Sequence, residues 1–135
     1  RSLEKRGVLE MYLIFDTSIL IELDRGDMNA IKKVSELIKI YPSPAKISFI
    51  SYFEFLYGLR NKSEKNREKS IKFIEKFDII QTSKETAHIL VNLKKNHELP
   101  LPDLLIAAHV KEKGGILLTK DGDFNKIKEI NKIIL

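Results

Sequence analysis

The chain has 135 residues, 43% hydrophobic and 32% charged, a balance that excludes disordered and fibrous proteins and predicts one globular domain. It contains no cysteine, which excludes disulfides, cysteine-ligated zinc and a thiol nucleophile, and suits a cytoplasmic protein. The net charge of +5 favours an anionic partner such as nucleic acid, although solvated lysines alone would give the same value. No apolar run approaches the roughly 18 residues that span a bilayer, so we expect no membrane association.

Residues 1–10 precede a methionine, Met11, that opens a strand-like run. We interpret them as an upstream extension or a cloning remnant, which makes Met11 a candidate for the natural start. The folded domain is expected to comprise residues 11–135.

Short apolar runs alternate with amphipathic segments along the rest of the chain. Residues 11–15 are all apolar and end at Asp16, which is typical of a buried strand in a parallel sheet. Thr17 and Ser18 can cap the helix that follows, and Gly26 ends it. The same patterns predict further helices at residues 28–40, 51–60, 63–77, 83–96 and 103–113, a turn at 120–123, and strands at 46–50, 78–80, 116–118 and 131–135.

Strands that alternate with helices in this way favour the α/β class. We expect a three-layer α/β/α domain in which a mostly parallel sheet of about five strands lies between two layers of helices. No linker, internal repeat or low-complexity segment interrupts the pattern.

Five acidic residues stand at the predicted ends of strands or starts of helices: Asp16, Glu54, Asp103, Asp121 and Asp123. Each has an ordinary structural explanation, as a helix cap, as the capping-box partner of Ser51, as a first-turn charge or as a turn residue. In an open α/β sheet, however, sites form where the carboxyl ends of the strands meet. These side chains are therefore expected to converge on one edge of the sheet.

Converging carboxylates repel one another, by about 4 kcal/mol for a pair at about 4 Å and an effective dielectric constant near 20. A divalent metal relieves this repulsion, and Mg²⁺ or Mn²⁺ suits such all-oxygen ligands. Such an ion can activate water for attack on phosphorus, so no nucleophilic side chain is needed. The three histidines, His88, His97 and His109, show no metal-ligand or triad spacing and are expected to be surface, loop or core residues.

A stretch rich in basic and aromatic residues surrounds and follows Glu54. Seven basic residues lie between positions 60 and 76, against three acidic ones, and Arg60 is a candidate contact for a substrate phosphate. A solvated helix face is the alternative interpretation. Gly58 indicates either close approach of another backbone or of a substrate, or the fraying end of its helix. Base stacking and packing in the core or in a dimer are both open for the aromatic side chains Tyr52, Phe53, Phe55 and Tyr57.

Four motifs, in this order, resemble those of the PIN-domain ribonucleases and, among these, the VapC-type toxins of toxin–antitoxin pairs: FDTSIL, EFLYG, PDLLIAA and TKDGDF. The resemblance runs from residue 11 to residue 135. It implies that the catalytic, metal-binding residues are Asp16, Glu54, Asp103 and Asp121, with Asp123 as a further or alternative ligand. Thr119 and Ser18 would be hydroxyls that support these ligands or position water.

The resemblance also implies an activity and partners. We expect a Mg²⁺- or Mn²⁺-dependent endoribonuclease that hydrolyses RNA phosphodiester bonds and is the toxin of a VapBC-type pair. A small antitoxin protein would hold it inactive, and the toxin would form a homodimer. Two alternatives stay open: a PIN-like module that binds RNA or protein without cutting, and a housekeeping RNA-processing nuclease of the same fold.

Overall fold

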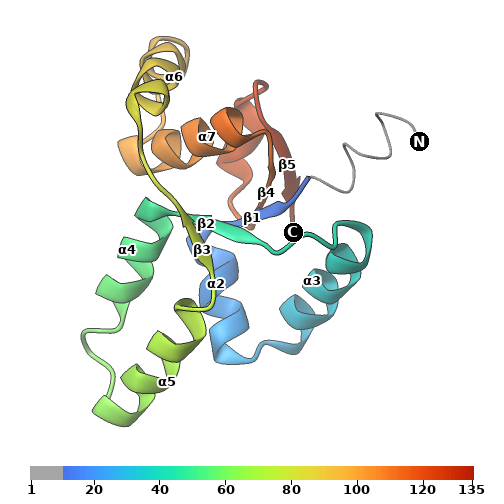
Figure 1. The fold of residues 1–135 in the computed structure, drawn as a ribbon, viewed down its shortest axis with the longest axis vertical. Helices are drawn as coiled ribbons and strands as arrows, with labels where there is room; N and C mark the ends of the chain where they lie inside the picture. The colour runs from blue at the N-terminus through green and yellow to red at the C-terminus, as the bar shows by residue number, and fades with distance from the viewer. Residues whose placement is uncertain (1–10) are drawn as a thin grey trace.

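Five parallel strands form the central sheet, in the order β3-β2-β1-β4-β5, in a computed structural model that describes residues 11–135 (Figure 1). They are β1 (Leu13–Phe15), β2 (Lys46–Ser48), β3 (Asp78–Ile80), β4 (Ile116–Thr119) and β5 (Asn131–Ile134). The predicted α/β class and the parallel five-stranded sheet are confirmed. The extension proposed at residues 1–10 lies outside the described residues.

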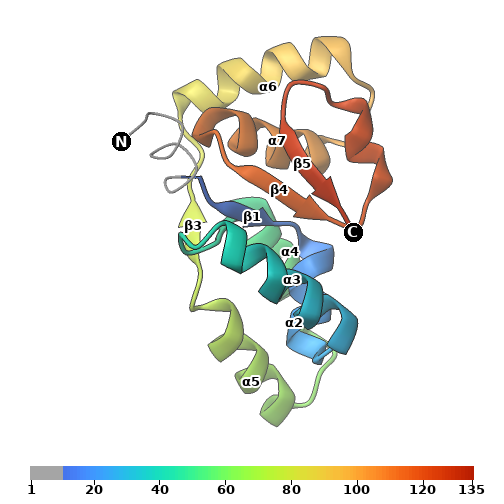
Figure 2. The same ribbon diagram turned by 90° about the vertical axis from the view of Figure 1, so that its right-hand side faces the viewer.

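Helices cover both faces of this sheet (Figures 1 and 2). One face carries α6 (Lys84–Asn96) and α7 (Leu101–Lys113), and the other carries α2 (Thr17–Arg25), α3 (Met28–Ile40), α4 (Phe49–Gly58) and α5 (Glu64–Ile74). A short 3-10 helix, η1 (Gly122–Lys126), follows β4, where the sequence predicted only a turn. Within residues 11–135, no helix combines the length and the apolar character that crossing a bilayer requires.

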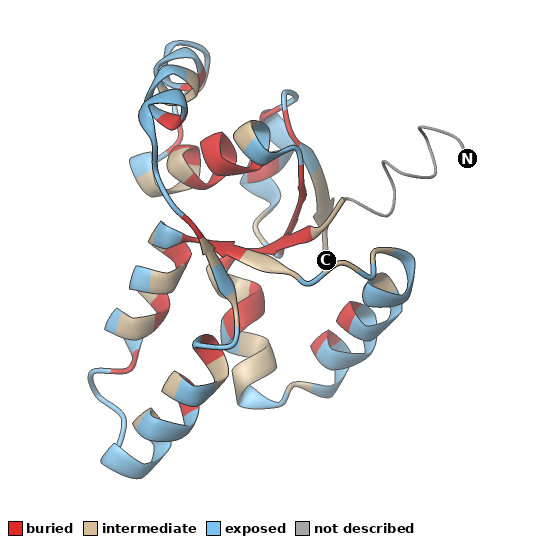
Figure 3. Ribbon diagram, viewed as in Figure 1, coloured by how far each residue is buried: buried red, intermediate tan, exposed pale blue. Residues whose placement is uncertain are grey.

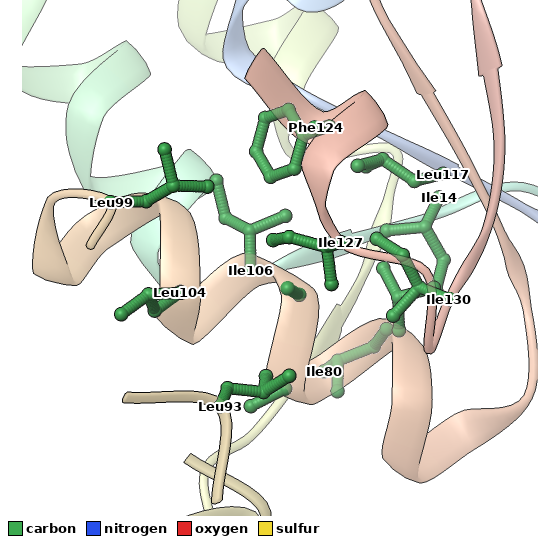
Figure 4. Packing of buried hydrophobic residues seen from close by; sticks show 13 residues of the cluster. Ile14, Ile80, Leu93, Leu99, Leu104, Ile106, Leu117, Phe124, Ile127 and Ile130 are labelled. Atoms are coloured by element: carbon green, nitrogen blue, oxygen red, sulfur yellow. The ribbon is translucent and has the colours of Figure 1, made fainter. Parts of the chain in front are cut away.

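The two sides of β1 face two hydrophobic cores, because successive residues of a strand point to opposite sides of the sheet. Leu13 and Phe15 pack into the core on the side of α2 to α5, and Ile14 packs into the core on the side of α6 and α7 (Figure 4). All residues of β1 and β4 are buried (Figure 3). This burial on both sides explains why their sequences are apolar without alternation.

A close contact between β1 and the start of β4 depends on a glycine. A Cβ atom built on Gly115 would lie 2.8 Å from Ile14 Cδ1 and 3.0 Å from the carbonyl oxygen of Tyr12. Both distances are shorter than ordinary van der Waals contact. Any larger residue at position 115 would therefore force the Ile14 side chain, and to a smaller extent the backbone at Tyr12, to shift.

The start of α4 differs from the prediction. Ser48 caps the helix, since its Oγ accepts a hydrogen bond from the backbone N–H of Ile50 at 3.0 Å. Phe49 and Ile50 therefore belong to α4 and not to a strand. Ser51 is buried within the first turn, and its hydroxyl has no hydrogen-bond partner among residues 11–135. The capping-box interpretation of Glu54 was therefore wrong, because Ser48 holds the cap position.

Candidate active site

Asp16 stands at the carboxyl end of β1 and caps α2. Its backbone N–H donates to the carbonyl oxygen of Leu118 at 2.9 Å, which continues the pairing of β1 with β4. Its carboxylate accepts two short hydrogen bonds, from the backbone N–H of Thr17 at 2.7 Å and from Thr119 Oγ1 at 2.6 Å. The residue is only 7% exposed. The predicted capping role is confirmed, with Asp16 itself as the cap in place of Thr17 or Ser18.

Glu54 reaches the same edge from α4. Its Oε1 accepts a hydrogen bond from Thr17 Oγ1 at 2.6 Å, which joins α2 to α4 across 37 positions of the sequence. Within residues 11–135 this is the only hydrogen bond of the Glu54 side chain. Thr17 was not among the predicted site residues, because the sequence alone suggested only a helix cap at that position.

Asp103 lies in the first turn of α7, after Pro102, where no side chain caps the helix. Its carboxylate has no hydrogen-bond donor among the described residues. Burial, more than any other cause, raises the pKa of Asp103 from 3.8 to about 6. The remaining contributions come from four neighbouring carboxylates, in decreasing order Asp121, Asp16, Glu54 and Asp123.

Asp121 and Asp123 follow β4 and open η1. Thr119 Oγ1 accepts a hydrogen bond from the Asp121 N–H at 3.0 Å, and Asp121 Oδ1 accepts one from the Asp123 N–H at 2.9 Å. Asp123 also faces Lys126, with 3.7 Å between its Oδ1 and the lysine Nζ. Asp121 contributes to the raised pKa of Asp16 as well, whereas Asp123 does not. These contacts favour Asp121 over Asp123 as the fourth acidic residue of the site.

The structure thus brings the predicted carboxylates to one edge of the sheet. Burial raises the pKa of Asp16, and repulsion from Glu54 and Asp121 adds to it, while the bonds from Thr119 and Thr17 act in the opposite direction. Asp16 contributes to the raised pKa of Asp103, although the two residues are 87 positions apart in the sequence. The edge therefore holds negative charge that protein donors balance at Asp16 but not at Asp103.

Ser18 and Arg60, two further residues predicted for the site, lie in different surroundings from each other. Ser18 lies between α2 and the loop after β4, since its Oγ is 3.5 Å from Asp16 Oδ2 and accepts the Lys120 N–H at 3.2 Å. Arg60 lies just after α4 and packs against the end of that helix. Its guanidinium is 3.9 Å from the centre of the Tyr57 ring and donates to the Tyr57 carbonyl oxygen at 2.8 Å. The structure gives Arg60 no contact with the carboxylates.

The histidines lie apart from the acidic edge. His109 is buried in α7, with Nε2 3.2 Å from Thr82 Oγ1, and burial lowers its pKa. His97 pairs with Glu129 at 3.0 Å, and His88 is exposed on α6. The predicted locations are confirmed, since His109 lies in the core, His88 on a helix surface and His97 in the loop after α6.

The donor set fits a hard divalent cation that keeps most of its water. Within the part of the chain that the structure describes, no three Asp, Glu or His side chains come close enough to enclose a metal ion by themselves. Mg²⁺, however, commonly takes only one or two protein carboxylates and fills its other positions with water and substrate oxygens. Asp103, which has no hydrogen-bond donor among the described residues, and the four carboxylates that repel it supply the negative charge that such an ion would balance.

A cavity of about 320 Å³ adjoins the acidic edge between α2, α4 and the segment that connects α4 to α5. Glu54 lines it, together with Gly58, apolar side chains that include Phe55, and the charged residues Asp24, Arg25 and Lys62. A Cβ atom built on Gly58 would meet no atom within 4 Å. The close approach predicted at this glycine is therefore not made by the described part of the chain itself.

Comparisons with known proteins identify the family and agree with the fold. A family model of the PIN domain matches residues 13–130. A chain of VapBC2 from Rickettsia felis, solved with a DNA fragment from its promoter, is 23% identical with a TM-score of 0.79, over 93% of this chain and 99% of that one. A toxin–antitoxin complex from Klebsiella pneumoniae gives 27% identity, a TM-score of 0.73 and coverage of 90% and 95%.

A third structure, VapBC-1 from nontypeable Haemophilus influenzae, gives 24% identity, a TM-score of 0.74 and coverage of 92% and 98%. No curated protein sequence matches the chain. The resemblance to VapC-type proteins, found in four short motifs, now extends to the whole described fold. Since the family model spans most of the sequence, the chain belongs to the PIN-domain family.

Proposed function

We propose that this protein is a metal-dependent endoribonuclease and the toxin of a VapBC-type toxin–antitoxin pair. The observation that carries the proposal is the position of four carboxylates at one edge of the sheet, where Asp103 has no hydrogen-bond donor among the described residues. Partly buried carboxylates that repel one another destabilise a protein unless they serve a ligand. The structural relatives named above are toxin–antitoxin complexes, which supports the biological role.

In this proposal the metal ligands are Asp16, Glu54, Asp103 and Asp121, with Asp123 as an outer member. The chemistry supplied by Mg²⁺ or Mn²⁺, when bound, is activation of water and neutralisation of charge on the phosphoryl oxygens. Thr119 holds the Asp16 carboxylate in one orientation, since its hydroxyl donates to Oδ2 at 2.6 Å. Arg60 is the proposed contact for a flanking RNA phosphate, and it would have to leave the Tyr57 ring to reach one.

Two protein partners belong to the same proposal. A small antitoxin with a cationic segment would inhibit the enzyme, because a positive side chain can replace the metal among the carboxylates. A second copy of the chain is proposed to cover the exposed aromatic face of α4, formed by Phe49, Phe53 and Tyr57, which are 45%, 51% and 57% exposed. We also infer a cytoplasmic location, where RNA and an antitoxin would be found.

The activity can be tested with the purified protein and a mixed RNA substrate. We expect cutting with Mg²⁺ or Mn²⁺, none with a chelator, and none with Asp16→Asn under any metal. The matched control is Asp78→Asn, which neutralises an exposed aspartate at the start of the edge strand β3 and should cut like the wild type. If wild type and Asp16→Asn are equally inert with several metals, the protein is a binding module and the proposal fails.

The role as a toxin is tested separately from the activity. Expression of the chain alone should stop growth of a bacterial host, and co-expression of a small protein encoded directly beside its gene should restore growth. An active nuclease that does not slow growth and has no such neighbour would be a housekeeping RNA-processing enzyme.

A further inference from the structure

The Glu54 carboxylate stands between two environments. On one side lies the acidic edge, where Asp16 and Asp103 carry like charge. On the other side lies the cavity of about 320 Å³, which Glu54 also lines together with three other charged residues, Asp24, Arg25 and Lys62. A glutamate side chain is long and flexible enough to turn toward either one.

Electrostatic repulsion disfavours the position of Glu54 at the edge. Asp16 and Asp103 repel its carboxylate there, whereas the cavity is lined by two cationic residues and one acidic residue, Asp24. Lys62 does not hold Glu54 in the structure, since its Nζ donates to Ser70 Oγ at 3.2 Å and lies 3.5 Å from Asp24 Oδ2. Something in the fold must therefore hold Glu54 at the edge.

The Thr17 hydroxyl is the group that does so. Its bond of 2.6 Å to Oε1 is the only hydrogen bond that Glu54 makes within residues 11–135. Thr17 is itself well fixed, because it is the first residue of α2 and its backbone N–H donates to Asp16 Oδ1 at 2.7 Å. As a β-branched residue it also has few χ1 rotamers. One residue thus orients two carboxylates, Asp16 through its backbone and Glu54 through its side chain.

We propose that Thr17 is a positioning residue that holds the Glu54 carboxylate at the acidic edge for metal binding. The inference rests on the proposed function, since it presumes that the edge binds a divalent cation. Thr17 touches neither metal nor RNA in this proposal and acts through Glu54. Losing its hydroxyl leaves the ligand present but free to turn toward the cavity.

The test measures Mn²⁺ binding by electron paramagnetic resonance, which needs no RNA and no turnover. Thr17→Val removes the hydroxyl at nearly constant volume, and we expect the dissociation constant for Mn²⁺ to rise about 3- to 10-fold, the range of one hydrogen bond. Thr17→Ser keeps the hydroxyl and should stay within about 2-fold of the wild type. If Thr17→Val does not fold, Thr17→Ala removes the same group without adding a methyl.

A double-mutant cycle separates positioning from a general structural role. With Glu54→Gln as the background, Thr17→Val should weaken Mn²⁺ binding no further, because the carboxylate it positions is gone. An equal loss in both backgrounds would overturn the proposal, and so would a Thr17→Val protein that binds Mn²⁺ like the wild type. RNA cutting by each variant should follow its Mn²⁺ affinity and recover at high Mn²⁺ concentration.

The outcomes also distinguish this inference from the proposed function. If the wild type binds Mn²⁺ and cuts RNA but Thr17→Val is unchanged in both, the inference about Thr17 fails and the nuclease proposal stands. If the wild type neither binds Mn²⁺ nor cuts RNA, both proposals fail together.

Discussion

Replacing Asp103 by asparagine should stabilise the metal-free protein at neutral pH, although the residue is proposed to be essential for activity. Folding raises the pKa of Asp103 from 3.8 to about 6, so ionising this carboxyl is harder in the folded state than in the unfolded state. At about 1.4 kcal/mol for each pKa unit, the difference would reach about 3 kcal/mol at neutral pH. Asp103 is partly exposed, and solvent screening reduces the expected effect to about 1 to 2 kcal/mol.

The sign of the pH dependence follows from proton binding. Between the two pKa values the folded state binds more protons than the unfolded state, so the free energy of unfolding of the wild type falls as the pH rises from about 4 to about 6. Asp103→Asn has no proton to lose at this position and should lack that fall. The two proteins should have similar stability near pH 4, and the variant should be the more stable above pH 6.

Urea denaturation followed by circular dichroism, with a chelator present and at several pH values, measures this difference. Asp78→Asn is the control, since this exposed aspartate on β3 should change the stability by no more than about 0.5 kcal/mol at any pH. A wild type more stable than Asp103→Asn at neutral pH would refute the electrostatic argument. An equal difference at every pH would show that packing and not charge is responsible.

Three further changes test other contacts of the structure. Thr119→Val should lower the free energy of unfolding by about 1 to 3 kcal/mol, because it removes a buried hydroxyl that donates to Asp16, and Thr119→Ser should lose less. Gly115→Ala should lower it by about 1 to 3 kcal/mol, because its Cβ would overlap Ile14. Phe53→Ser should shift the protein from dimer to monomer in analytical ultracentrifugation at unchanged helix content, because this exposed ring belongs to the proposed dimer face.

Each of these three predictions has a result that would contradict it. A Thr119→Val protein as stable as the wild type would mean that the hydroxyl bond adds nothing to folding. A neutral Gly115→Ala would mean that the Ile14 side chain can shift at no cost to make room for the methyl group. A Phe53→Ser protein that still sediments as a dimer would place the interface elsewhere, and a wild type that sediments as a monomer would remove the dimer from the proposal.

The arrangement of elements follows from periodicity that can be seen in the sequence. The runs at β1 and β4 are apolar because both of their faces are covered, and this pattern predicted buried parallel strands. The strand predicted at residues 46–50 ended too late, because Phe49 and Ile50 are apolar in either structure. Serines stand at both 48 and 51, and only the backbone geometry decides that Ser48 is the cap.

The sequence predicted which carboxylates lie at the acidic edge but not the hydrogen bonds that they make. The sequence places Asp16 and Asp121 after strands, and the parallel sheet brings the ends of these strands together. The bond between Thr17 and Glu54 joins two helices far apart in sequence, and no local pattern encodes it. The only available signal was a hydroxyl residue directly beside Asp16, and a helix cap explained it equally well.

The single hydroxyl of Thr119 couples the positions of two segments of the acidic edge, the end of β1 and the start of η1. The hydroxyl donates a hydrogen bond to Asp16, and its oxygen accepts one from the N–H of Asp121. The end of β1 and the segment after β4 are therefore joined through a single atom. Any partner that pulls on η1 would break one of these two bonds or turn the Asp16 carboxylate with it. Displacement of η1, a short helix at the border of the acidic edge, would therefore change the surroundings of Asp16 without any contact with its carboxylate.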